Sequence, residues 1–386
     1  MEITRRTALA GGMMMLGGAC TGPAQALGDV AAPPSTAGSL NAIATATGMR
    51  FGSAVGAGPS GSGSFRNPAY AALLKRDCGV LVPENEMKWQ ALRPGPNAYN
   101  FAPFDDMVDF AEKNGIAIRG HTLMWHRPQW QPGWLEVHDF GARPASEAER
   151  LLTSHIKTVT DRYRGRITSY DVVNETVMED STLAQTAISR AMGGTEALVD
   201  LAFHTARAQL PDAQLVYNDY MSWEPGNEKH RAGVLKLLEG LRKRGTPVDA
   251  LGIQSHIRID SYDPSTGTGP HDARAWRKFL DEVVAMGYDL LVTEFDVNDQ
   301  ALPADTASRD ASVAAYAKDY LDLMFSYPQL RDVLAWGLCD RFSWLQEFQP
   351  LRGDGQAKRP CPYDAEFSPK PLHTAIATSF RVAAAR

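Results

Sequence analysis

One arrangement recurs along most of this chain and constrains its fold more than any other feature. A helical stretch ends at a glycine, a short apolar strand follows, and polar side chains stand where the strand ends. Gly165, for example, precedes the apolar run 170–173, which leads into Asn174 and Glu175. Near-continuous apolar strands separated by helices indicate a parallel sheet that is covered on both faces.

Eight strands of this kind follow one another at helix-length intervals. They are expected at 51–55, 80–82, 116–119, 170–173, 215–217, 250–253, 290–293 and 333–336. Eight strand–helix units predict a (β/α)8 TIM barrel, an α/β fold in a single domain. The competing arrangement is an open doubly wound sheet. The glycines after residue 55 lack the spacing, and the following amphipathic helix, of its nucleotide-binding loop.

The first 26 residues have the pattern of an export signal. Arg5 and Arg6 precede the short apolar run 8–16, an order typical of a twin-arginine signal peptide. Cleavage after Ala26 fits the small-residue rule for such signals, and Cys20 offers a rival site of the lipoprotein type. The sequence therefore predicts a signal peptide over residues 1–26.

The segment 27–40 is rich in Ala, Pro and Ser and is interpreted as a linker, which leaves 41–386 for the catalytic barrel. We expect an exported protein, periplasmic or secreted, or anchored through Cys20 if the rival site is used. The apolar run near the N-terminus is far shorter than the roughly 20 residues of a spanning helix, so no membrane span is expected.

Composition excludes several classes of protein. The chain is 44% hydrophobic and 22% charged, as in ordinary globular proteins, which excludes disorder and collagen. A net charge of −6 argues against nucleic acid as a partner, because phosphate binding needs a basic surface. The four cysteines are too few for a disulfide framework. We consider a disulfide between Cys339 and Cys361, and expect Cys78, on the second strand, to be a buried free thiol.

Polar side chains at the carboxyl ends of the strands form the candidate site. In a (β/α)8 barrel these ends meet at one face, where active sites lie. Helix capping would explain one such residue, but it explains seven poorly. The seven are Glu84, His121, Glu175, Asn218, His256, Glu294 and Asp340.

Two glutamates among these residues suggest a chemistry. Glu175 follows the fourth strand and Glu294 ends the seventh, so a barrel would place their carboxyl groups across the mouth from each other. Two opposed carboxyl groups are the minimum for glycosidic cleavage, because one protonates the leaving oxygen and the other attacks or activates water. Either glutamate alone would be interpreted as part of a surface ion pair. The presence of both on opposite sides of the mouth favours hydrolysis.

The surrounding sequence resembles glycoside hydrolase family 10, the endo-β-1,4-xylanases. The stretches 171–175 (DVVNE) and 293–296 (TEFD) resemble the acid/base and nucleophile motifs of that family. Five more motifs match in the family's order, at 82–89, 119–126, 217–220, 252–256 and 336–344. The resemblance covers residues 45 to 380, and seven ordered motifs make a chance match implausible.

The resemblance implies a retaining double displacement with Glu294 as nucleophile and Glu175 as general acid/base. Glu175 must be protonated when it first acts, so its pKa should be raised, and Trp125 would supply apolar cover for it. Glu294 must stay ionised. His256 would hydrogen-bond to Glu294, with Asp296 holding the imidazole from behind.

The same resemblance implies a set of sugar-binding groups. Asn174 would bind the 2-hydroxyl of the sugar, an interaction that strengthens in the transition state. Trp336 and Trp344 would form apolar platforms, and a wall near Trp344 and Lys88 would crowd the hydroxymethyl group of glucose and so favour xylose. The sugar-binding set comprises Glu84, Asn85, Lys88, His121, Trp125, Asn174, Gln254, His256, Trp336 and Trp344, with Asp296, His126 and Asn218 behind it.

Three alternatives remain open. One is a broader β-1,4-glycanase, and another is a noncatalytic sugar-binding barrel, against which the two intact glutamates speak. The third is a zinc hydrolase that uses His121, His126 and His256, but the first strand, 51–55, lacks the usual His-x-His pair. We therefore expect no metal and no cofactor, xylan and xylo-oligosaccharides as partners, and a monomer.

Overall fold

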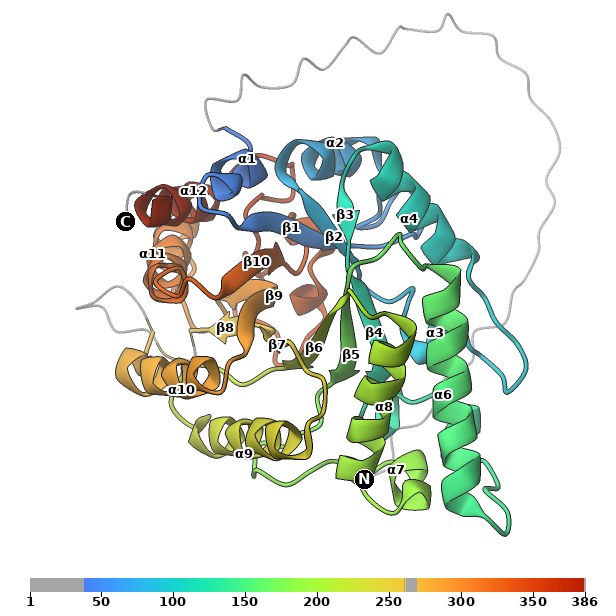
Figure 1. The fold of residues 1–386 in the computed structure, drawn as a ribbon. Coiled ribbons are helices and arrows are strands. Elements are labelled where there is room, and N and C mark those ends of the chain that lie inside the picture. The colour runs from blue at the N-terminus through green and yellow to red at the C-terminus, as the bar shows by residue number, and fades with distance from the viewer. Residues whose placement is uncertain (1–37, 260, 262–268, 385–386) are drawn as a thin grey trace, which may run out of the picture. The chain divides into compact units, whose positions relative to one another are not determined.

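The strands pair in parallel in the order β3-β2-β1-β10-β9-β7-β6-β5-β4, with β8 added on β9. The computed structural model describes residues 38–259, 261 and 269–384, and Figure 1 shows the strands enclosed by the helices. The strands are β1 (Arg50–Val55), β2 (Val80–Pro83), β3 (Ala117–Ile118), β4 (Gly120–Trp125), β5 (Ser169–Asn174), β6 (Gln214–Asp219), β7 (Ala250–Ile253), β8 (His256–Arg258), β9 (Asp289–Asn298) and β10 (Leu330–Ala335).

The predicted (β/α)8 barrel is confirmed, with one difference in its third strand. The expected strand 116–119 is interrupted at Arg119, where β3 ends and β4 begins. β3 pairs with β2 and β4 pairs with β5, so the two pieces together close the ring. The strand therefore extends to Trp125, six residues beyond the predicted end, because β4 pairs with β5 on both sides of a register shift between His121 and Met124.

Helices cover the outside of this ring. They are α1 (Leu40–Thr45), α2 (Pro68–Asp77), α3 (Trp89–Leu92), α4 (Ala102–Lys113), α5 (Gly133–Glu136), α6 (Pro144–Arg162), α7 (Ala187–Met192), α8 (Thr195–Gln209), α9 (Glu228–Arg244), α10 (Ala273–Ala285), α11 (Thr306–Met324) and α12 (Pro371–Ala384). Three short 3₁₀ turns are η1 (Pro128–Trp130), η2 (Asp340–Phe342) and η3 (Trp344–Gln346). No described helix is both long and apolar enough to cross a bilayer.

Helix α4 shows how the sequence pattern produces this packing. Phe104, Met107, Val108 and Ala111 recur at helical spacing, and all four are completely buried against the barrel. Burying a large apolar side chain contributes about 1.5–3 kcal/mol, so such stripes hold the ring of helices in place. The chain turns into β3 through Gly115, whose φ of 66° is readily adopted only by glycine.

The two ends of the described chain lie together. Helix α12 packs against α11 and against α1, as Figure 1 shows at the meeting of blue and red ribbons. Helix α1 begins at Leu40, where the side chain of Ser39 caps it by accepting a hydrogen bond from the Ala42 amide. The predicted signal peptide 1–26 and most of the predicted linker lie outside the described residues.

The disulfide considered between Cys339 and Cys361 is wrong. Cys78, Cys339 and Cys361 are buried free thiols. A parallel bridge sets Cys339 opposite Tyr363, so this register does not bring it to Cys361, and its Sγ donates to the carbonyl of Asp364 at 3.0 Å. Cys78 is buried and free as expected, but it lies at the end of α2 rather than on the second strand.

Candidate active site

The predicted nucleophile Glu294 contacts His256, whose imidazole is held from its other side by Asp296. It lies on β9 with 6% of its surface exposed, and its Oε2 is 3.2 Å from Nε2 of His256. The other imidazole nitrogen, Nδ1, is 3.0 Å from Oδ1 of Asp296, because β8 pairs with β9 in the register that sets these two residues opposite each other. Oδ2 of Asp296 accepts a hydrogen bond of 2.7 Å from the Trp344 indole.

This arrangement sets the charges of the group. Burial alone would raise the pKa of Glu294, but the hydrogen bond from His256 and the nearby His121 and His256 rings bring that pKa below its usual value. Burial opposes the charge on His256 as well, yet Asp296 and Glu294 together raise the pKa of His256 to about 10. At neutral pH Glu294 is therefore ionised and His256 is protonated.

Glu175 is held in a different environment. It follows β5 with a backbone φ of 56°, a left-handed conformation that costs energy in a residue other than glycine and that clusters at functional sites. Its amide donates to the Asn218 carbonyl at 2.9 Å. Burial raises the pKa of Glu175, Gln254 and the Trp125 indole oppose that rise, and the charges of Asp219 and Glu294 add to it. Glu175 is thus the carboxyl group of the pair that retains its proton to higher pH.

Three amide side chains, here called the amide bridge, connect the two glutamates: Asn174, Asn218 and Gln254. Nε2 of Gln254 donates to Oε1 of Glu175 at 2.8 Å and lies 3.4 Å from Oδ1 of Asn174. Nδ2 of Asn218 donates to the same Oδ1 and to Oε1 of Glu294, each at 2.8 Å. Because the oxygen of Asn174 accepts both bonds, its NH2 group is the part left to donate elsewhere.

Lys88 places a positive charge among the carboxyl groups. Its Nζ donates to Oδ1 of Asn85 at 3.0 Å and lies 4.5 Å from the centre of the Trp125 ring. Burial lowers the pKa of Lys88, while Glu294, Glu84 and Glu175 act in the opposite direction. Burial raises the pKa of Glu84, with Lys88 opposing. The predicted residues after β2 therefore do share one electrostatic environment with both glutamates.

His121 is oriented by an ion pair that the sequence analysis did not assign. Its Nδ1 lies 2.9 Å from Oδ2 of Asp171, whose Oδ1 accepts from Nη2 of Arg119 at 2.5 Å. All three side chains are almost fully buried. A signal was present in the sequence, because Arg119 and Asp171 each place a charge in an otherwise apolar stretch.

The three predicted aromatic groups flank these polar residues. Trp125 is partly buried and stacks on Trp130, with ring centres 4.7 Å apart and planes within 14°. Trp344 lies 5.0 Å from the His256 ring. Trp336 is only 7% exposed and stands edge-on to His121, with ring centres 5.5 Å apart. Trp344 and Trp125 thus offer more surface to a ligand than Trp336 does.

His126, predicted behind the sugar-binding set, and Asp340, predicted at a strand end, have other surroundings. Burial lowers the pKa of His126 to about 3, and neither of its ring nitrogens has a hydrogen-bond partner among the described residues. Only its backbone amide contributes, by donating to the Asn174 carbonyl at 2.9 Å. Asp340 pairs with Lys370 at 2.9 Å, in the η2 turn. Within the described ranges, no three His, Cys, Asp or Glu side chains are placed to hold a metal ion.

The profile of Glycosyl hydrolase family 10 matches residues 39–379. The chain belongs to glycoside hydrolase family 10. It is 32% identical over 316 residues to endo-1,4-beta-xylanase B of Thermotoga neapolitana, covering 80% of this chain and 82% of the relative. It is 32% identical over 313 residues to beta-1,4-xylanase of Dictyoglomus thermophilum, covering 78% and 82%.

Solved structures agree with this family assignment. Native xylanase 10B from Thermotoga maritima superposes with a TM-score of 0.77 at 28% identity, covering 90% of this chain and 99% of that one. Xylanase 10B from Thermotoga petrophila RKU-1, in complex with xylobiose, gives the same TM-score and identity, covering 89% and 97%. The (β/α)8 barrel of this family 10 member is therefore shared with both.

One further charged residue of this family 10 site was missed from the sequence. Arg127 follows β4, is buried, and its Nε lies 3.8 Å from Oε2 of Glu175. No local pattern marks it, because its partners Val177 and Tyr220 are 50 and 93 residues away in the chain.

Proposed function

We propose that this protein is an endo-1,4-β-xylanase that cleaves xylan by a retaining double displacement. The observation that carries the proposal is the opposite shift of two buried carboxyl groups at one barrel mouth. The pKa of Glu175 is raised and that of Glu294 is lowered. A proton donor facing an ionised nucleophile is the division of roles that glycosidic cleavage requires. The family membership and the xylanase names of the relatives support the substrate.

In the first step an oxygen of Glu294 attacks the anomeric carbon. The bond from that carbon to the leaving chain breaks, and Glu175 gives its proton to the departing oxygen. The product is an ester between the sugar and Glu294, which no longer carries a charge. Since the charge of Glu294 is one cause of the raised pKa of Glu175, that pKa falls as the ester forms.

In the second step Glu175 acts as a base. It takes a proton from water as the water oxygen bonds to the anomeric carbon and the ester bond breaks. Glu294 regains its charge and Glu175 regains its proton, so the cycle closes with no other reactant. Two inversions at the same carbon retain its configuration.

Sugar recognition is assigned to the groups around this pair. The NH2 group of Asn174 is placed to donate to a sugar hydroxyl, because its oxygen is already engaged by Gln254 and Asn218. Lys88 and Trp344 form the wall that we propose to exclude the hydroxymethyl group of glucose. Rates on xylan and on carboxymethylcellulose measure this preference, and equal rates would favour the broader β-1,4-glycanase.

The central test is product analysis from a defined xylopentaose. We expect internal cleavage, with the new reducing end released first as the β-anomer, observed by proton NMR. Glu294→Ala should abolish hydrolysis and retain sugar binding, whereas Glu239→Ala, at an exposed helical ion pair, should hydrolyse normally. Release of the α-anomer, or normal turnover by Glu294→Ala, would contradict the mechanism.

We also propose that the protein is exported. The support is the arginine pair and apolar run within residues 1–26. N-terminal sequencing of the protein from the periplasm or medium should begin after Ala26. A lipid-modified N-terminus at Cys20 would identify the rival anchored form, and an intact Met1 in the cytoplasm would contradict export.

A further inference from the structure

Arg127 is a buried cation beside the proposed acid/base that the mechanism above does not use. Its side chain is 7% exposed, and Nε lies 3.8 Å from Oε2 of Glu175, the oxygen that Gln254 does not hold. Within the described part of the chain, this Nε has no hydrogen-bond partner. A buried donor without a partner costs free energy, so its orientation toward a carboxyl oxygen calls for an explanation.

The rest of the guanidinium group is firmly held. Nη2 donates to the Val177 carbonyl at 2.9 Å and to the Tyr220 hydroxyl at 2.7 Å, and Nη1 contacts the sulfur of Met178. Tyr220 in turn donates to Glu179 at 2.7 Å. The group therefore has little freedom to leave Glu175, and a guanidinium stays charged throughout the working pH range.

The other charges that face Glu175 come from three strands or their ends. Burial raises the pKa of Glu175, and Asp219 and Glu294 raise it further. Lys88 and Arg127 are the positive charges near it. Asp219 is itself engaged by His230 at 3.1 Å and by the Tyr217 hydroxyl. Arg127 is thus the fixed positive charge on the Oε2 side of a carboxyl group in a mainly negative setting.

We propose that Arg127 is a positioning residue that orients Oε2 of Glu175 and favours its ionised form when the glycosyl ester is hydrolysed. This role rests on the proposed function. During hydrolysis of the ester, Glu175 must first be ionised so that it can then accept a proton from water. An opposite charge within about 4–6 Å stabilises the ionised form of a carboxyl group by one to three pKa units.

The two steps of the reaction make opposite demands, and Arg127 serves the second. Without it, the surrounding negative charge and burial would keep Glu175 protonated after the ester has formed, and water would have no base. When Arg127 is present and Glu294 has lost its charge in the ester, the guanidinium is the strongest charge near Oε2 of Glu175 and favours the ionised carboxylate. The same residue can then donate a proton in one step and accept one in the next.

The test compares Arg127→Met, Arg127→Lys and the wild-type enzyme on two substrates. Xylopentaose, whose leaving sugar needs a proton from Glu175, gives the pH profile of kcat/KM. An aryl β-xylobioside with an activated leaving group makes ester hydrolysis limit turnover and gives kcat. For Arg127→Met the basic limb of kcat/KM should move up by about one pH unit, because Glu175 holds its proton longer. The acidic limb of kcat should also move up, and kcat at neutral pH should fall about tenfold when ester hydrolysis limits turnover. Arg127→Lys should restore part of both changes.

Azide separates the proposed role from a structural one. It attacks the sugar ester without needing a base, with its nitrogen bonding to the anomeric carbon as the ester bond breaks. Azide should therefore restore turnover by Arg127→Met. The matched control is Arg93→Met, which removes another buried arginine, whose guanidinium donates to the carbonyls of Pro96 and Leu151 and to the Ser154 hydroxyl and lies over the Tyr99 and Trp134 rings. Its pH profile should match that of the wild type.

Two outcomes would overturn the proposal: an Arg127→Met basic limb that coincides with the wild type, or a rate that azide does not restore. If Arg127→Met fails to fold, Tyr220→Phe removes one anchor of the guanidinium and should shift the same limb upward by less. An unmoved limb there would also overturn it. A wild-type enzyme that does not cleave the xylobioside would instead refute the proposed function.

Discussion

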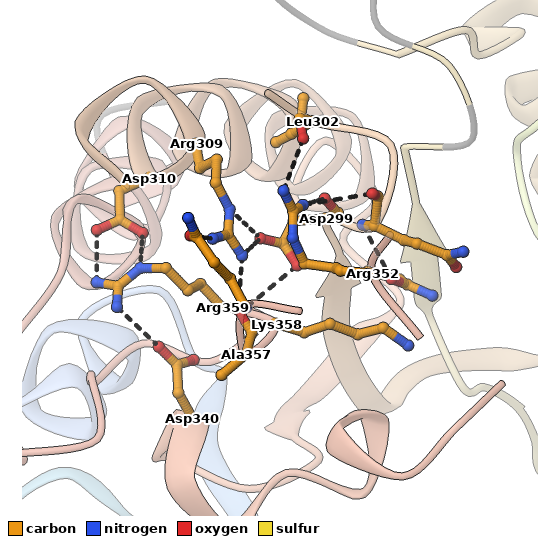
Figure 2. Close-up of polar contacts among 12 residues, drawn as sticks. Asp299, Leu302, Arg309, Asp310, Asp340, Arg352, Ala357, Lys358 and Arg359 are labelled. Carbon is orange, nitrogen blue, oxygen red and sulfur yellow. Dashed lines mark hydrogen bonds and ion pairs between the residues drawn. The ribbon is translucent and has the colours of Figure 1, made fainter. Parts of the chain in front are cut away.

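Strand β9 and the residue after it supply carboxylates to two groups of charged side chains that differ in how completely the charges are paired. Glu294 and Asp296 face the barrel mouth. Asp299, one residue past the strand, faces the loop charge cluster shown in Figure 2. That cluster comprises Asp299, Arg309, Asp310, Asp340, Arg352 and Arg359.

In the loop charge cluster, cations and carboxylates are matched. Arg309 forms an ion pair with Asp299 at 2.5 Å, and Arg359 donates two hydrogen bonds of 2.7 Å to the carboxylate of Asp310. Arg352 donates to the carbonyls of Asp299 and Leu302. At the mouth, by contrast, amide groups and one imidazole hold two glutamates whose pKa values are pushed apart. The matched group serves to hold a loop, whereas the mismatched group is the one that can exchange protons with a substrate.

The first prediction sets one group against the other and has the largest expected effect. Glu294→Gln should reduce kcat/KM by about 10⁴-fold or more. Asp299→Asn should leave kcat per folded molecule nearly unchanged but lower the free energy of unfolding by about 3–5 kcal/mol, because it leaves Arg309 buried without its anion. Steady-state kinetics and urea denaturation measure the two effects. If Glu294→Gln lowered the free energy of unfolding as much as Asp299→Asn, the barrel mouth and the loop charge cluster would not differ in their contribution to stability.

The second prediction concerns the His256 imidazole, which lies between Glu294 and Asp296. His256→Gln should lower kcat/KM by about 10–100-fold, as expected for a group that orients another. It should also raise the pKa of Glu294, whose ionised form is active above that pKa and is lost as pH falls. The acidic limb of kcat/KM should therefore move to higher pH. An acidic limb that stays in place would show that His256 does not control Glu294.

The third prediction is a dependence of stability on pH. The pKa of His256 is raised from about 6.5 in the unfolded chain to about 10 in the fold. A group with a raised pKa stabilises the fold fully below its unfolded pKa, and that contribution disappears as pH rises through the folded value. Melting temperatures of the wild type should therefore fall between pH 7 and pH 10 more than those of His256→Gln. Parallel curves would contradict the raised pKa.

The smallest expected effect is that of reductant. The loop charge cluster is held by ion pairs, and the Cys361 amide donates to Asp340 of that cluster at 2.9 Å without any disulfide nearby. The melting temperature should be the same with and without reductant. Unfolding without reductant should make Cys78, Cys339 and Cys361 all available to alkylation, as mass spectrometry would show. If two of these cysteines could not be alkylated without reductant, the chain would contain a disulfide and the prediction would be wrong.

The sequence predicted the barrel because its strands are buried on both faces and therefore read as apolar runs. It predicted the placement of Glu175 and Glu294 because strand ends in this fold converge. It failed at β4, where pairing with β5 includes the polar His121 and resumes at Met124 after a register shift, beyond the point at which the apolar run ends. The sequence also could not predict contacts between distant loops. The partners of Arg127 and the bridge between Cys339 and Tyr363 produce no pattern in the neighbouring residues.

The amide bridge has a consequence for the movement of protons. Each of its links is an N–H of Gln254 or Asn218 donating to an oxygen, and an amide neither gains nor loses a proton at neutral pH. The bridge therefore fixes the spacing of Glu175 and Glu294 but acts as an insulator between them. Each carboxyl group must exchange its proton with the substrate or with water, and so the two can hold different protonation states throughout a catalytic cycle.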